Sequence, residues 1–222
     1  MLKKLFLSTL VGLSAAMPVM AENPDVTYRS LDSLGCIMLR ECTEDVNQVK
    51  SVEDIQALLP DSDYESHKEE LNGLFEQLNA LNIDVFVADE KYFPPRHRGI
   101  YDVKANTFFL NPEYIWDDSH LIGVMRHEGW HAAQDCMAGT LDNTFTAVIL
   151  QDGTVPQYIV DTVARTYPPQ PRPWENEAFY AAVQPGMTTQ ALAACASDTP
   201  MWDTYTPTPM TREWLENKGF IQ

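Results

Sequence analysis

Positive charge and long apolar runs are both scarce in this chain. It carries 15 lysines and arginines against 32 aspartates and glutamates, which gives a formal net charge of −17. A surface this acidic repels nucleic acid and anionic lipid, so we expect neither as a partner. After residue 21 no apolar stretch is long enough to cross a bilayer, which argues against stable membrane insertion. The chain also lacks internal repeats and low-complexity segments.

The first 21 residues have a composition of their own. Lys3 and Lys4 precede an apolar run that starts at Leu5, and small residues stand at Val19 and Ala21. This layout is typical of a secretory signal peptide. The apolar run is too short and too interrupted for a comfortable membrane anchor. We therefore expect cleavage after Ala21 and export, either to a periplasm or to the extracellular medium.

Cysteine is another scarce residue, with only four in the chain. Cys36, Cys42, Cys136 and Cys195 do not form the CxxC pairs of a cysteine-based zinc site. An even number of cysteines in an exported chain favours disulfides. We predict a local Cys36–Cys42 bridge and a long-range Cys136–Cys195 bridge, with buried free thiols as the alternative.

The mature chain divides at about residue 62. Residues 22–62 form an N-terminal extension, in which a short helix is predicted to begin after Ser51 and to end at Pro60. Residues 63–222 form one domain that ends in several helices. Within it, residues 64–82 place leucine and phenylalanine at spacings of three and four, which predicts an amphipathic helix.

Three short strands and a long helix are predicted next. Residues 83–88 alternate in the manner of a strand, and residues 100–103 and 107–110 flank a turn. Asp117 is a candidate N-cap for the helix that follows. Further helices are predicted to begin near Trp174, at a Thr188 or Thr189 cap, and at Thr208. This order indicates an α+β fold with a small mixed sheet.

The stretch MRHEGWHAAQDC on that long helix carries the clearest chemical motif. His127 and His131 stand four residues apart, so a helix presents both imidazoles on one face, one turn apart. Two such imidazoles supply half of a tetrahedral zinc site. Glu128 lies beside the first histidine and can reach a water molecule there. Two ordinary histidines are the alternative, but the apolar flanks and preceding strands favour a metal.

The third metal ligand has to be a carboxylate. No histidine follows His131, which excludes the motif with a third histidine. Glu177, in WENEAFYAA, is the first choice because a second helix packed beside the first can bring it over the metal. Asp142, in GTLDNTF, ranks second, and its segment resembles a ligand segment of the aspzincins. Glu175 ranks third, because it faces a different side of its helix from Glu177.

Together, HExxH and the Asn-Glu-Ala of residues 176–178 resemble the zincin metallopeptidases, most closely the compact gluzincins. The likeness covers residues 64–182. It implies a zincin-like fold with a backing helix, a small mixed sheet, an HExxH helix and a downstream ligand helix. The chain departs from the larger gluzincins at Ala181, where they place an aspartate that holds a zinc histidine. The histidine's partner is therefore unassigned.

The resemblance implies an exported zinc metallopeptidase. His127, His131 and Glu177 are expected to hold Zn²⁺, and Glu128 is expected to act as the general base that activates water. Tyr180 is a candidate for stabilising the oxyanion, with core packing as an equal alternative. His97 or Arg98 could also serve there.

The resemblance and the layout also suggest a peptide or protein substrate. If residues 107–111 form the sheet edge nearest the site, an extended peptide could pair with that strand. Two other functions stay open. The chain could be a non-catalytic zincin-like binding protein, or a zinc amidase that acts on cell-wall peptides.

Overall fold

The computed structural model describes residues 31–141 and 145–222. The predicted signal peptide and Asp142 lie outside these residues. The helices are α1 (Leu31–Met38), α2 (Val52–Leu58), α3 (Lys68–Ala80), α4 (Asp118–Met137), α5 (Gln157–Thr166), α6 (Arg172–Ala182), α7 (Met187–Cys195), α8 (Met201–Thr204) and α9 (Pro209–Lys218). The strands are β1 (Val46–Val49), β2 (Asp84–Ala88), β3 (Gly99–Asp102) and β4 (Thr107–Leu110). Short 3₁₀ turns are η1 (Glu65–His67), η2 (Glu90–Tyr92) and η3 (Pro112–Tyr114).

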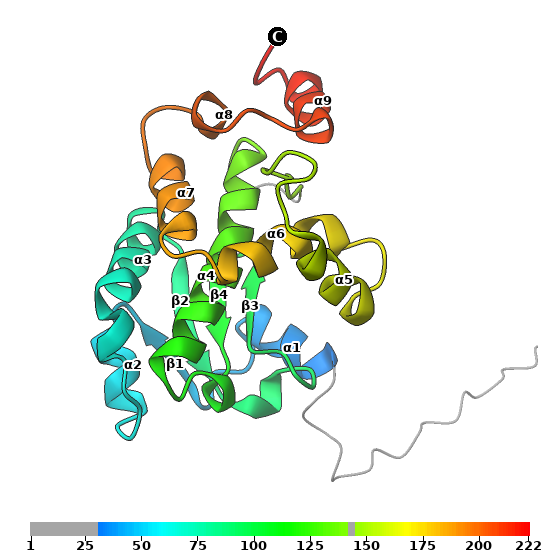
Figure 1. Cartoon of the computed structure of the whole chain (residues 1–222). Coiled ribbons are helices and arrows are strands. Elements are labelled where there is room, and N and C mark those ends of the chain that lie inside the picture. Colours follow the sequence, from blue (N-terminus) through cyan, green and yellow to red (C-terminus); the bar gives the residue numbers. More distant parts are fainter. Residues whose placement is uncertain (1–30, 142–144) are drawn as a thin grey trace, which may run out of the picture.

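The four strands form one mixed sheet in the order β1-β2-β4-β3 (Figure 1). Strand β2 is antiparallel to β1 and parallel to β4, while β3 is antiparallel to β4. This confirms the α+β class with a small mixed sheet. The strand at residues 107–110 is internal, because β2 pairs with its other side. The edge strand beside α4 is β3, which corrects the expectation that residues 107–111 form that edge.

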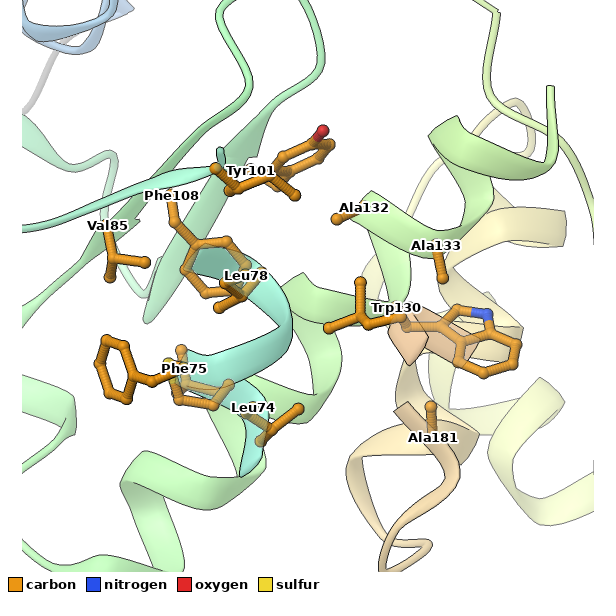
Figure 2. Close-up of a cluster of buried hydrophobic side chains, with 14 of the residues drawn as sticks. Leu74, Phe75, Leu78, Val85, Tyr101, Phe108, Trp130, Ala132, Ala133 and Ala181 are labelled. Atoms are coloured by element: carbon orange, nitrogen blue, oxygen red, sulfur yellow. The ribbon is translucent and has the colours of Figure 1, made fainter. Parts of the chain in front are cut away.

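Each face of the sheet is covered by apolar side chains from helices. Figure 2 shows Val85 and Phe108 of the sheet facing Phe75 and Leu78 of α3, in the larger core that α4 also lines. On the opposite face, Phe86 and Phe109 stack with ring centroids 5.7 Å apart and pack with residues of α1. The alternation of side chains along β2 therefore serves two cores, since neighbouring residues of a strand point to opposite faces.

Side-chain caps fix the start of three predicted helices. Ser51 accepts a hydrogen bond from Asp54 N–H, Asp117 accepts from His120 N–H, and Thr208 accepts from Thr211 N–H. The predicted threonine cap of α7 is wrong. That helix begins after Gly186, whose φ of 74° lies in the left-handed region that glycine adopts without strain.

Helix α4 lies at the centre of the molecule, with α3, α6 and α7 packed against it (Figure 1). The Arg126 guanidinium of α4 forms a two-pronged ion pair with Glu70 of α3, at 2.8 and 2.6 Å. The N–H of Gly186 donates to the same carboxylate at 2.9 Å. Three polar groups, one from each of three segments, thus meet at one point, which fixes how α3 and the α6–α7 turn sit on α4.

Two disulfides confirm the predicted pairing. One joins Cys36 to Cys42, and the other joins Cys136, near the end of α4, to Cys195, at the end of α7. None of the helices within residues 31–141 and 145–222 combines the length and apolar character that a membrane crossing requires.

We predict that Glu70 makes the stability of the protein sensitive to acid. Burial alone would raise the pKa of Glu70, but hydrogen bonds from Arg126 and from Gly186 N–H outweigh it and lower that pKa. Its stabilising contribution is therefore complete above the ordinary pKa of about 4.3 and is lost as the pH falls through the lower folded-state value. Glu70→Gln should cost about 2 kcal/mol at pH 7 and less at pH 3.

Urea unfolding at the two pH values measures this difference. Glu76→Gln, on the exposed side of the same helix, is the control and should change little at either pH. An equal cost of Glu70→Gln at both pH values would contradict the assignment.

We also predict a steric limit where α7 crosses α4. A Cβ at Gly129 would lie 2.8 Å from Thr188 Cγ2, and the Thr188 hydroxyl is held by the Arg126 carbonyl at 2.8 Å. Gly129→Ala should therefore lower the free energy of unfolding by about 1 kcal/mol, even though alanine favours helix. Thr188→Ser removes the methyl group and keeps the hydroxyl. In that background, chemical denaturation should find Gly129→Ala neutral or stabilising; the same loss in both backgrounds would rule out the steric cause.

Candidate metal centre

The two histidines of the motif lie on one face of α4. The ring centroids of His127 and His131 are 5.0 Å apart, and the ring planes are nearly perpendicular, at 86°. Each side chain retains 16% of its accessible surface. The pair is therefore largely buried yet still open to a small ligand.

A carboxylate from α6 completes this group. One oxygen of Glu175 lies 3.4 Å from His127 Nε2, and the other lies 3.8 Å from His131 Nε2. One ligand atom from each of the three residues lies within 4.8 Å of the other two, so His127, His131 and Glu175 could together hold a metal ion.

The chemistry of these three residues fits a divalent cation. Two imidazoles and one carboxylate are the donors of many catalytic zinc sites. Glu175 Oε2 is buried and faces His127 Nε2 at 3.4 Å, without the geometry of a full hydrogen bond. A cation between this carboxylate and the two rings would satisfy the buried oxygen more completely.

Glu177, the ligand expected from the sequence, points elsewhere. Its side chain is buried at 2% exposure and accepts hydrogen bonds from Trp130 Nε1 at 3.1 Å and from Gln134 Nε2 at 2.7 Å. The backbone N–H groups of Ile149 and Leu150 also donate to it. Both oxygens of the Glu177 carboxylate accept hydrogen bonds from protein donors, and Glu175, not Glu177, stands in the candidate metal set.

The phenol next to the site is also not the expected one. No hydrogen bond or ring contact within the described part of the chain joins Tyr180 to the metal group. Phe179 stands one helical turn after Glu175 and meets the His127 ring edge-on at 5.0 Å. The Tyr167 hydroxyl lies within hydrogen-bonding reach of Glu175, and burial, followed by the charges of Glu175 and Glu128, raises the pKa of that phenol.

Glu128 lies between α4 and the edge strand β3. The side chain is buried at 7% exposure and faces the Tyr101 N–H of β3. Burial raises the pKa of Glu128 to about 7, a rise that the Glu175 charge supports while His127 and Tyr101 N–H oppose it. A carboxylate with a pKa near neutrality can both accept and release a proton under physiological conditions.

Each histidine has a second partner that orients its ring. His131 Nδ1 lies 2.8 Å from Gln134 Oε1, so the Nδ1–H donates there and Nε2 is left to face Glu175. The backbone carbonyl of Ala178 faces the His127 ring. Burial and the nearby His127 lower the pKa of His131 to about 4, which keeps this imidazole neutral, as a metal ligand must be. Gln134 and Ala178 thus fill the role that the sequence left unassigned.

Glu175 ranked last among the candidate ligands because a sequence pattern does not determine how α6 is rotated about its own axis. Residues two apart on a helix point in directions about 200° apart, so only one of Glu175 and Glu177 can face α4's histidines. One feature of the sequence pointed to Glu175. Glu175 and Phe179 stand one turn apart and share the face of α6 that meets the histidines. The buried residues of this helix, in contrast, are Glu177, Ala178 and Ala181.

No protein-family model, curated protein or solved structure matches this chain. A function is therefore inferred from the arrangement of His127, His131 and Glu175 with Glu128 beside them.

We predict that Glu175 is required for metal binding. Glu175→Gln should reduce zinc affinity at least about 100-fold, because it replaces a charged ligand with a neutral one in the group of three donors that the described residues bring together. Glu213→Gln, an exposed change on α9, is the control and should bind like wild type. Competition with a chromophoric chelator measures both affinities. Wild-type binding by Glu175→Gln would remove this residue from the site.

Proposed function

We propose that this chain is an exported zinc-dependent peptidase of the gluzincin type. The observation that carries the proposal is the convergence of His127, His131 and Glu175, with Glu128 of α4 beside them, facing the edge strand β3. The arrangement has the parts that metal-assisted hydrolysis needs: three donors for one cation, and a buried proton acceptor next to them.

Zinc is the metal that the donors favour. Imidazole nitrogen with one carboxylate oxygen suits Zn²⁺ better than Mg²⁺ or Ca²⁺, which prefer oxygen ligands. A zinc ion at this position would supply Lewis acidity, which lowers the pKa of water towards about 7 and polarises a carbonyl group.

The chain's own groups carry the proton chemistry. Glu128 takes a proton from the attacking water and passes it to the amine that leaves when the peptide bond breaks. The close approach of β3 keeps this carboxylate in place. A Cβ at Gly99 would lie 3.0 Å from Glu128 Cγ and 2.7 Å from Val124 Cγ1, so only glycine leaves room there. For the oxyanion we assign Tyr167, rather than Tyr180, because its hydroxyl lies within reach of Glu175.

A polypeptide substrate fits the position of the edge strand. Within the described residues β3 pairs with β4 alone, and it packs along α4. An extended peptide could therefore add to its open side through main-chain hydrogen bonds. Such pairing would bring a peptide bond past Glu128, because that side chain packs against the same strand beside Gly99.

Export accounts for the disulfides and for the composition of the N-terminus. Disulfides persist in oxidising compartments, and both cysteine pairs of this chain are bridged. The first 21 residues have the layout of a signal peptide. A periplasmic or secreted enzyme combines these features.

We predict that Glu128→Gln separates binding from catalysis. The amide keeps the size of the side chain but cannot accept the proton, so peptide hydrolysis should fall by about 10²–10⁴-fold. Zinc content, measured by elemental analysis, should stay at the wild-type level because Glu128 is not among the metal-holding residues.

The same assay distinguishes the alternative functions. It should include a broad peptide library and peptidoglycan fragments. Cleavage of the fragments alone would make the chain a cell-wall amidase, and zinc binding without any cleavage would make it a binding protein. Full activity in Glu128→Gln would overturn the assigned general base.

A further inference from the structure

Glu177 has a role that the metal ligands do not explain. Its carboxylate is buried where α4, α6 and the loop before α5 meet, and it accepts four N–H groups. Three of these donors, the Trp130 indole and the N–H groups of Ile149 and Leu150, cannot reverse their role. The fourth donor, the Gln134 amide, can present either its nitrogen or its oxygen.

The surroundings of Gln134 determine which way this amide faces. Its Nε2 lies 2.7 Å from Glu177 Oε2 and 3.2 Å from the Trp174 carbonyl oxygen. Both of these oxygens are acceptors, so a reversed amide would place oxygen against oxygen twice. The orientation is therefore fixed, and Oε1 has to face the opposite direction.

That opposite direction leads to the metal group. Gln134 Oε1 lies 2.8 Å from His131 Nδ1. An amide oxygen only accepts, so His131 has to carry its proton on Nδ1. The lone pair of the ring is then on Nε2, the atom that lies 3.8 Å from Glu175.

We propose that Glu177 is a positioning residue, which acts through the Gln134 amide to hold His131 in the tautomer and ring orientation that a metal ion requires. The proposal rests on the metal site of the proposed function. It assigns to Glu177 and Gln134 the part that a carboxylate bonded directly to a histidine plays in other zinc sites.

The loop that supplies two of the donors is itself held in place. We name residues 145–151 the strap. Thr211 of α9 donates to the Val148 carbonyl at 2.8 Å, and the Trp174 indole donates to the Thr146 carbonyl. The strap is also tied directly to α4, since Ala147 N–H donates to the Gln134 carbonyl at 2.9 Å. The backbone donors facing Glu177 are thus fixed from both sides.

The test compares three variants of the full chain by two measurements. The first is ¹⁵N–¹H NMR of His131 in the metal-free protein at pH 8, which reports the ring tautomer. The second is zinc affinity by chelator competition. Glu177→Gln should give mixed tautomers and bind zinc about 10–100-fold more weakly. Gln134→Met removes the acceptor itself and should do the same.

Trp130→Phe is the matched control, since it removes one donor to Glu177 and leaves the contact with Gln134. It should lower thermal stability while His131 keeps its Nδ1 proton and zinc affinity stays within about 3-fold of wild type. If Glu177→Gln also loses only stability, with tautomer and affinity unchanged, Glu177 is structural and the proposal fails. If Glu177→Gln does not fold, Gln134→Met decides, and an unchanged tautomer there overturns the proposal.

The two readouts keep this inference separate from the proposed function. A wild-type chain that binds no zinc would refute the metalloenzyme. The tautomer of metal-free His131 would still show whether Glu177 and Gln134 control the ring.

Discussion

The burial of Glu177 between α4 and the strap is the constraint on which the rest of the site depends. A carboxylate taken out of water needs several donors, and this one obtains them from two helix side chains and two backbone N–H groups. Those contacts fix the rotation of α6 about its own axis. Because Glu175 lies two residues earlier, about 200° around the same helix, anchoring one carboxylate inward turns the other towards His127 and His131. The rotation of α6 therefore determines both positions at once: Glu177 is buried in the core, and Glu175 faces the two histidines.

Much of the scaffold could be predicted from local patterns. The motif, the caps at Ser51, Asp117 and Thr208, and the three strands between residues 83 and 110 depend on near neighbours in sequence, and they occur as predicted. Both disulfides also join the cysteines that were predicted to pair. Strand β1 was missed because its sequence, VNQV, has little strand character and is held by pairing with β2. Here tertiary pairing overrides local propensity.

The details of the site could not be predicted in the same way. Choosing between Glu175 and Glu177 requires the rotation of α6, which is set by the buried donors and not by any pattern within the helix. Choosing Tyr167 over Tyr180 requires the path of the chain from α5 into α6, where three prolines and an arginine shape the turn. Arg172 of that turn donates to the Tyr167 carbonyl at 2.9 Å and so helps to place the phenol. Such contacts join distant segments and leave no periodic signal in the sequence.

The strap has a consequence for how sequences of this kind can vary. Surface loops usually tolerate insertions, because their backbone serves no partner other than water. Residues 145–151 are different, since α9 donates hydrogen bonds to their backbone on one side and the buried Glu177 carboxylate accepts hydrogen bonds from it on the other. One extra residue between Ala147 and Ile149 would displace the N–H groups facing Glu177 by about 3.4 Å, more than a hydrogen bond can follow. The contacts on both sides of this short segment therefore leave no room for an insertion, and the buried side chains of Ala147 and Ile149 restrict its composition as well.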